Sequence, residues 1–173
     1  VIKWSVFHTF KLNFDILFVF YWLPMNIIYL HGFKSSSSSI KGQLLEQYCA
    51  KYPDIQVHLP DLNMPPMAAI QKISKLIQSM DQVALVGSSL GGFYATYFVA
   101  KYACPAVLIN PAMQPWQLFK DLFGIEQIPL KVTESWTLDT DQLQQLQSIA
   151  NTRLNHADKI LVLLQQDDEV LDY

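Results

Sequence analysis

The sequence has few charged residues, little glycine and almost no cysteine. Charged side chains make up 16% of the 173 residues and the formal net charge is −3, so the chain lacks the basic surface of a nucleic-acid-binding protein. The two cysteines, Cys49 and Cys104, lie far apart and form no C-x-x-C pair, which argues against a disulfide framework and a zinc site. We therefore expect no metal, no nucleic-acid partner, and reduced thiols in a cytosolic protein.

The chain is instead rich in apolar and aromatic residues. Hydrophobic residues make up 51% of it and aromatic residues 13%. A disordered chain would be rich in charge and poor in aromatics, and six glycines with nine prolines are too few for collagen or a low-complexity linker. This composition and length predict one globular domain with a substantial core.

Residues 1–24 differ from the rest of the chain. The apolar run Ile16–Leu23 is too short for a transmembrane helix, which needs about 20 apolar residues. Two lysines precede the run, as in a signal peptide, but no small-x-small cleavage site follows it. We interpret residues 1–24 as lying outside the domain, with translation starting at Met25. The alternative is that this segment is a signal or tethers the protein to a membrane.

From Met25 onward, short apolar runs alternate with amphipathic ones, which predicts β-α-β units and a parallel sheet. The runs are hydrophobic throughout, as expected for strands covered on both faces. We expect a doubly wound α/β fold with its site beyond the carboxyl ends of the strands. The predicted strands are Asn26–Leu30, Ile55–Leu59, Val83–Val86, Ala106–Ile109 and Ile160–Leu164, and the predicted helices are Ser39–Tyr48, Pro66–Met80, Gly91–Tyr102 and Asp139–Ile149.

A G-x-S-x-G motif follows the third predicted strand, with Ser89 at its centre. Such a motif between a buried strand and an apolar helix predicts a sharp turn that exposes the serine as a nucleophile. Glycines at its ends leave room for the neighbouring chain. The helix that follows directs its free N–H groups at the site, so we expect the Leu90 N–H to stabilise an oxyanion. Ser88 beside it is expected to contact substrate.

The first predicted strand ends in His31-Gly32-Phe33. A sharp turn at Gly32 would direct the Phe33 N–H toward Ser89, which makes it the second expected oxyanion donor, and Gly32 is expected to contact substrate. Removing one such donor costs about 2.7–4 kcal/mol of transition-state stabilisation. We interpret His31 as a structural residue of this loop, and not as the general base.

An acidic turn follows the fifth predicted strand. In this architecture the catalytic order along the chain is serine, acid, histidine, and we assign the acid to Asp168, with Asp167 as the alternative. A serine needs a positioned base to become a good nucleophile, yet no histidine follows Asp168. We therefore expect that the helix, strand and histidine loop of the complete domain are missing after Tyr173, and that the truncated chain is inactive.

Five segments together carry a more specific resemblance: Y-L-H-G-F, P-D-L, G-S-S-L-G-G-F-Y-A-T, I-N-P-A and D-E-V-L-D-Y. With these, residues 25–173 resemble the YqiA/YcfP-type small bacterial esterases, a branch of the α/β-hydrolase superfamily. The resemblance implies Ser89 as nucleophile, Asp168 as triad acid and a histidine beyond the chain. It also implies hydrolysis of carboxylic esters or acyl thioesters with short acyl groups, in the cytoplasm and without a cofactor.

Two alternatives stay open at this point. Residues 115–132 contain several apolar side chains after the fourth strand, which fit either a small cap over the acyl pocket or ordinary helix packing. The chain as a whole is either a small-molecule hydrolase or a non-catalytic ligand- or partner-binding relative that has kept the fold. The sequence does not give the oligomeric state.

Overall fold

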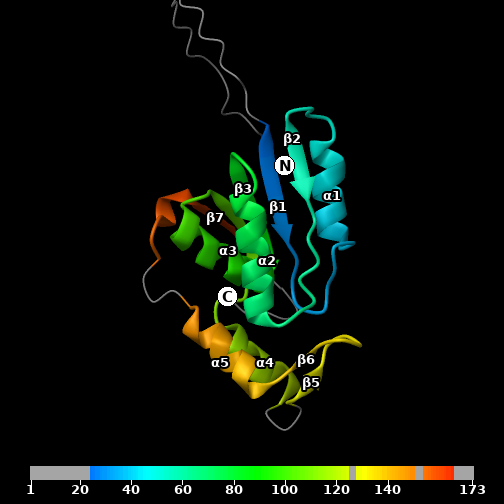
Figure 1. The fold of residues 1–173 in the computed structure, drawn as a ribbon, viewed down its shortest axis with the longest axis vertical. Helices are drawn as coiled ribbons and strands as arrows, with labels where there is room; N and C mark the ends of the chain where they lie inside the picture. The colour runs from blue at the N-terminus through cyan, green and yellow to red at the C-terminus, as the bar shows by residue number, and fades with distance from the viewer. Residues whose placement is uncertain (1–23, 125–127, 151–153, 166–173) are drawn as a thin grey trace, which may run out of the picture.

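The computed structural model describes residues 24–124, 128–150 and 154–165, so all but the last residue of the 1–24 extension lies outside it. One sheet of five strands, in the order β2-β1-β3-β4-β7, organises the fold (Figure 1). Every neighbouring pair of strands is parallel, which confirms the predicted α/β architecture. The strands are β1 (Met25–Leu30), β2 (Ile55–His58), β3 (Val83–Ser89), β4 (Ala106–Pro111) and β7 (Ile160–Leu163).

The four predicted helices lie where the apolar spacing places them, with ends shifted by at most two residues, and α4 and η2 are additional. Helix caps explain two of the starts: the Ser39 hydroxyl accepts a hydrogen bond from Gly42 N, and the Asp139 carboxylate accepts one from Gln142 N. Such caps satisfy N–H groups that have no partner within the helix. The helices are α1 (Ile40–Cys49), α2 (Pro66–Gln78), α3 (Leu90–Tyr102), α4 (Pro115–Phe123), α5 (Thr140–Ser148) and a 3-10 turn, η2 (Ala157–Lys159).

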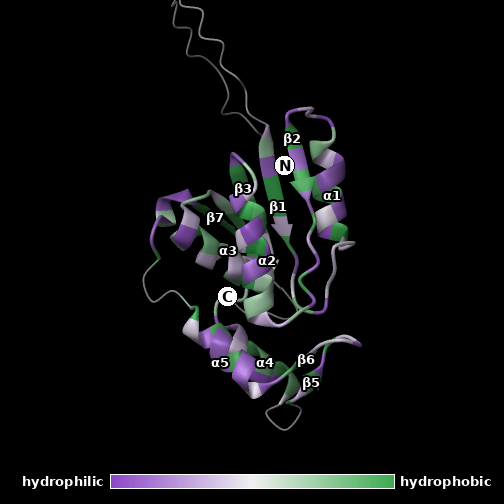
Figure 2. Ribbon diagram, viewed as in Figure 1, coloured by the Kyte–Doolittle hydropathy of each residue, from purple (hydrophilic) through white to green (hydrophobic). Residues whose placement is uncertain are grey.

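One face of the sheet packs tightly against α2 and α3. Their inward side chains and those of this sheet face form the core, and in Figure 2 α2 shows both hydrophobic and hydrophilic segments, as an amphipathic helix should. Full burial of a side chain such as Phe98, which is 0% exposed, contributes about 1.5–3 kcal/mol. The core residues on this side include Ile28, Leu30, Leu85, Ala106 and Leu108 of the sheet, Ile70, Ile73 and Ile77 of α2, and Phe98 and Val99 of α3.

The opposite face is covered unevenly. Helix α1 packs against this face at Tyr29. Its Gly42 lies so close that a Cβ atom built there would be 3.0 Å from the Tyr29 ring. Toward β7 the side chains on this face are half-buried or exposed, and Leu161 is 56% exposed. Within the described part of the chain, helix cover on this face is therefore concentrated over β1 and β2.

A small second layer lies beyond the carboxyl ends of the strands (Figure 1). It contains α4, α5 and a two-stranded antiparallel hairpin, β5 (Leu130–Lys131) with β6 (Thr137–Leu138). Its buried side chains include Phe119, Trp136 and Leu138, and they join the main core. We call these elements the cap layer. The hairpin was absent from the expected elements because two-residue strands leave no periodic pattern.

Two boundaries change the description of the site. Strand β3 continues through Ser88 to Ser89, and α3 begins immediately at Leu90, whereas the sequence predicted a strand ending at Val86 and a helix starting at Gly91. The register between β3 and β4 shifts between Ser88 and Ser89, so the chain leaves the regular sheet only at the serine.

Across the described ranges, no helix combines the length and the hydrophobicity that crossing a membrane requires.

Candidate active site

Ser89 occupies the junction between β3 and α3 in a backbone conformation that is rare for residues other than glycine. Its φ is 52° and its ψ is −119°, and a backbone conformation of this kind costs of order 1–3 kcal/mol, which contacts with the surrounding structure must offset. The Ser89 carbonyl accepts a hydrogen bond from Ala112 N at 3.0 Å, which ties the turn to the end of β4. The strained turn agrees with the geometry that G-x-S-x-G predicts.

The glycines around Ser89 let the backbone approach closely. A Cβ atom on Gly91 would lie 2.0 Å from the Leu30 carbonyl oxygen, and one on Gly87 would lie 2.4 Å from the Gly91 carbonyl oxygen. Both distances are far inside van der Waals contact and both involve backbone, which cannot move aside. Helix α3 therefore packs directly on the end of β1, with the first turn of the helix beside Ser89.

The loop after β1 reaches the same point. A Cβ atom on Gly32 would lie 3.2 Å from Ser89 Cβ and 3.7 Å from Ser89 Oγ, so Gly32 and Ser89 are direct neighbours. The Phe33 ring packs in the cap layer, with its centroid 4.3 Å from that of Phe119. The structure therefore brings the two segments of the predicted oxyanion hole, Gly32-Phe33 and Ser89-Leu90, together. The hydrogen-bonding roles of Phe33 and Leu90 remain predictions.

A cavity of about 350 Å³ opens at Ser89. Ser88, Ser89 and Asn110 form its sheet side, and α4 forms much of the rest. Larger hollows lie elsewhere among the described residues, of about 860 Å³ between β2 and α2, about 550 Å³ between α2 and α3, and about 430 Å³ on the open face of the sheet. None of them includes Ser89, so we place the candidate site in the smaller cavity. The described residues that line it are Phe33, Lys34, Lys41, Ser88, Ser89, Asn110, Leu118, Phe119, Leu122 and Phe123.

His31 is buried beneath this site and uses both ring nitrogens for structural contacts. Its side chain is 2% exposed. Leu62 N donates to Nε2 at 2.9 Å, and Nδ1 lies 2.8 Å from the Gly32 carbonyl oxygen. Nε2 also lies 3.3 Å from Asp61 Oδ1, but that contact would be an ion pair only with a protonated ring. The shorter Leu62 bond needs the Nε2 lone pair, so we assign a neutral ring with its proton on Nδ1. These contacts fit the expected structural role.

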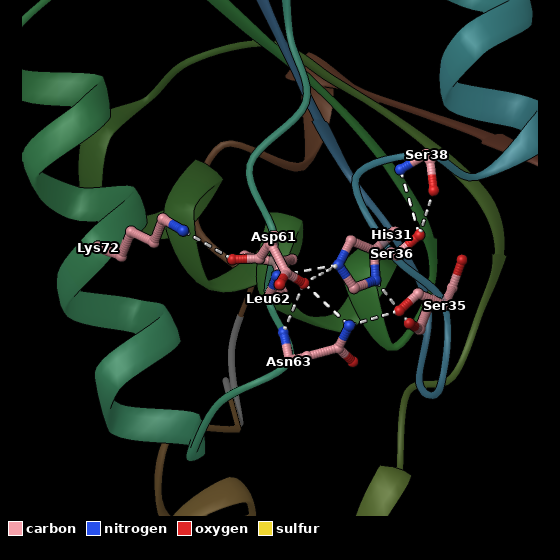
Figure 3. Close-up of polar contacts among 9 residues, drawn as sticks. His31, Ser35, Ser36, Ser38, Asp61, Leu62, Asn63 and Lys72 are labelled. Atoms are coloured by element: carbon pink, nitrogen blue, oxygen red, sulfur yellow. Dashed lines mark hydrogen bonds and ion pairs between the residues drawn. The ribbon is translucent and has the colours of Figure 1, made fainter. Parts of the chain in front are cut away.

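The loop between β2 and α2 holds the His31 loop in place (Figure 3). Asn63 Nδ2 donates to the Ser35 carbonyl oxygen at 2.7 Å and to Asp61 Oδ1 at 2.9 Å, and Lys72 Nζ donates to the Asp61 carbonyl oxygen at 2.9 Å. Partial burial acts to raise the pKa of Asp61, but the hydrogen bond from Asn63 N and the positive charge of Lys72 act to lower it, and the pKa is lowered overall. The network therefore fixes both sides of the loop that carries Gly32 and Phe33.

Replacing Asn63 with alanine is expected to loosen this loop. The loss of the bond to Ser35 should lower the free energy of unfolding by about 0.5–1.5 kcal/mol. If the loop carries an oxyanion donor, turnover should fall by roughly tenfold with little change in KM, because misplacing a catalytic group by a fraction of an ångström is costly. Urea unfolding and ester kinetics measure the two effects. Asn155→Ala, at an exposed position before η2, is the matched control, and equal kinetics in both variants would contradict a positioning role.

Asp168 lies outside the described residues, so its role stays a prediction. The last described residue before it is held at the site: Gln165 N donates to Asn110 Oδ1 at 2.9 Å, and Asn110 lines the cavity. Asn110 also has a positive φ of 42°. The chain therefore leaves β7 beside the cavity, at the edge of the sheet where the sequence places the acid.

None of the histidines in the described part of the chain is placed to activate Ser89. His58 lies in β2, where its Nε2 contacts Asn26 Oδ1 at 3.0 Å and burial lowers its pKa. His156 precedes η2 and β7, at the amino end of a parallel strand and so at the opposite edge from Ser89. Cys104 is no competing nucleophile, because burial raises the pKa of its thiol.

Three cavity residues were not found by sequence reasoning. Lys34 and Lys41 flank the serine-rich loop, and Asn110 ends β4. Isolated lysines in a polar loop carry no motif, and their position in the cavity follows from how the loop folds against α4. For Asn110 a signal was present, since it directly follows a buried strand at the edge of the sheet where ligands bind.

A parallel sheet ordered in this way, with a strained serine turn after its central strand, defines the α/β-hydrolase fold. Solved structures of similar fold include Est1E from Butyrivibrio proteoclasticus with bound ferulic acid, at a TM-score of 0.65 and 16% identity, covering 86% of this chain and 72% of that one. Another comes from a study of LipS and LipT, two metagenome-derived lipolytic enzymes, at a TM-score of 0.59 and 16% identity, covering 86% and 75%.

The chain belongs to the uncharacterised protein family UPF0227, which it matches over residues 26–173. A UPF0227 protein of Pectobacterium atrosepticum is 27% identical over 153 residues, covering 84% of this chain and 77% of the relative. One from Pectobacterium carotovorum shows the same identity and coverage. These matches confirm the family resemblance that the five sequence segments indicate.

Proposed function

We propose that this protein is a serine hydrolase that cleaves carboxylic esters or acyl thioesters through an acyl-serine intermediate. The observation that carries the proposal is the position of Ser89, on a strained positive-φ turn that opens into an apolar-walled cavity. Such a turn costs free energy, and strain of this kind persists mainly where function requires it. The similarity in fold to lipolytic enzymes supports the same reaction class.

In this mechanism Ser89 Oγ attacks the carbonyl carbon of the substrate while a histidine accepts its proton. The backbone N–H groups of Phe33 and Leu90 stabilise the oxyanion, and Asp168 orients the histidine. The tetrahedral intermediate collapses as the protonated histidine gives its proton to the leaving alcohol or thiol. Water then attacks the acyl-serine through the same base. We place the histidine outside the described residues, because His31, His58 and His156 are engaged or distant.

The cavity also supports a preference for short acyl groups. Its volume is about 350 Å³, near the lower end of the range for small-molecule sites. Leu118, Phe119, Leu122 and Phe123 of α4 give it an apolar wall, as expected if residues 115–132 cap an acyl pocket. A long acyl chain would have to leave this wall.

A fluorophosphonate probe tests the proposal directly. Incubated with the complete native protein, it is expected to label Ser89 within minutes, because only an activated serine reacts quickly with this electrophile. Mass spectrometry of the labelled peptide identifies the site, and heat-unfolded protein is the control for unspecific reaction. No labelling of the folded protein, together with no hydrolysis of p-nitrophenyl butyrate, would instead support the non-catalytic alternative.

A further inference from the structure

The charged residues that line the Ser89 cavity are all of one sign. Lys34 and Lys41 are the two charged side chains in the described lining, and no aspartate or glutamate joins them. This contrasts with the chain as a whole, in which acidic residues outnumber basic ones by 15 to 12. Lys34 and Lys41 together can bind the negatively charged group of a ligand, while Asp168, the predicted triad acid at this edge of the sheet, is expected to contact the histidine.

Lys34 is held at the cavity by its backbone and by aromatic rings. Its φ is 53°, in the left-handed region, where the turn directs the side chain toward α4. Lys34 Nζ lies 4.8 Å from the centroid of the Phe123 ring and 5.9 Å from that of the Phe33 ring, and both rings line the cavity. Such cation–π contacts orient the ammonium group without neutralising its charge.

Lys41 adds a second positive charge from the first turn of α1. That turn contains no acidic residue, and the partial positive charge of the helix N-terminus has the same sign as the lysine. Among the described residues, neither cavity lysine lies within ion-pair distance of a carboxylate. Both lysines are exposed and accessible to an incoming substrate.

We propose that the substrate of this protein is an anionic ester or thioester, whose negative group Lys34 and Lys41 bind while Ser89 attacks the carbonyl. This inference rests on the proposed function, since it names the substrate class of the same site. The negative group has two possible sources: a carboxylate at the far end of the acyl chain, or an acidic group on the leaving alcohol or thiol. The shared chemistry is one anion held beside an apolar pocket.

Two matched pairs of esters test the preference and separate the sources. Mono(4-nitrophenyl) adipate and 4-nitrophenyl hexanoate share a six-carbon acyl chain, and only the first carries an acyl-side carboxylate. 4-Butyryloxybenzenesulfonate and its neutral N,N-dimethylsulfonamide differ in charge on the leaving group. In one of the two pairs, we expect the anionic ester to have a kcat/KM about tenfold higher than its neutral partner at low salt. This is the effect expected when two partly solvated lysines attract one anion. The ratio should fall as ionic strength rises.

Variants of the two lysines test whether these side chains cause the preference for anionic esters. In the double variant Lys34→Met and Lys41→Met, the anionic-to-neutral ratio of kcat/KM should fall to about one, because methionine keeps the length of the side chain and removes its charge. Lys34→Glu and Lys41→Glu should reverse the preference. Lys51→Met, which removes an exposed lysine that packs on Tyr48, is the control and should leave the ratio unchanged.

The outcomes separate this inference from the proposed function. Equal kcat/KM within both ester pairs overturns the anionic preference while leaving the hydrolase intact. If no ester is cleaved, the proposed function fails, and binding of uncleaved analogues still decides the preference. N-butyl adipamic acid and N-butyl hexanamide serve for this in isothermal titration calorimetry. Tighter binding of the acid, lost in the double methionine variant, supports the inference; no difference between the two amides overturns it.

Discussion

Ser89→Ala is expected to abolish esterase activity while leaving the fold intact. If Ser89 forms the acyl intermediate, kcat should fall by about 10⁴–10⁶-fold, the range typical of removing a catalytic nucleophile. Alanine removes only the hydroxyl group, and Ser89 Oγ caps no helix N–H. Alanine at this positive φ, like serine, remains strained, so the change in the free energy of unfolding should be small. Initial rates with p-nitrophenyl butyrate and a thermal unfolding curve give both values.

The matched control for this variant is Ser79→Ala. Ser79 lies at the end of α2, is exposed and donates from its hydroxyl to the Leu76 carbonyl, outside the candidate cavity. It should retain nearly full activity. If Ser89→Ala kept more than a tenth of the wild-type rate, the observed hydrolysis would come from another group and the assignment of Ser89 would be wrong.

Gly91→Ala is expected to have the largest effect on folding. The new Cβ atom would lie 2.0 Å from the Leu30 carbonyl oxygen and 2.5 Å from its carbon, so α3 would have to move away from β1. Overpacking usually costs about 1–3 kcal/mol and occasionally more. Here the clash is with backbone atoms of the sheet, which cannot move aside. We therefore expect a loss of folding free energy at or above the top of that range. Loss of soluble protein, or a marked fall in the urea midpoint, is the expected result.

Gly32→Ala provides the contrast. Its Cβ atom would lie 3.2 Å from Ser89 Cβ and 3.7 Å from Ser89 Oγ, distances that need only a small adjustment. The variant should fold nearly as well as the wild type, yet lose activity because a methyl group occupies space beside the nucleophile. A Gly91→Ala protein as stable as Gly32→Ala would show that α3 can shift away from β1 at little cost.

The elements of the sheet could be predicted from the sequence because each one is encoded locally. Ile160–Leu163 and the other strands of the sheet contain short runs of apolar residues, and α2 repeats its isoleucines at helical spacing. The family-specific segments at Gly32 and Ser89 lie at strand ends. Since parallel strands end at one edge of the sheet, it follows that these two segments meet there.

Other features depend on contacts between distant segments, which no local pattern encodes. The Asn63 bond to the Ser35 carbonyl joins two loops 28 residues apart, and Lys34 reaches the cavity only because α4 brings Phe123 to it. Strand β3 runs on to Ser89 although G-S-S resembles a loop, because pairing with β4 outweighs the low strand propensity of glycine. The β5–β6 hairpin is too short to show any alternation.

The uneven cover of the sheet has a consequence for where the protein opens first. Among the described residues, β7 pairs with β4 at one edge of the sheet, and three of its four residues are exposed. An edge strand with few buried contacts belongs to the part of a fold that separates at low free energy, well before the whole domain unfolds. The segment that follows β7 starts at the cavity, where Gln165 bonds to Asn110. Amide hydrogens of β7 should therefore exchange with solvent sooner than those of β3, and on warming the bond between Gln165 and Asn110 should be lost while the Ser89 turn is still held in the sheet.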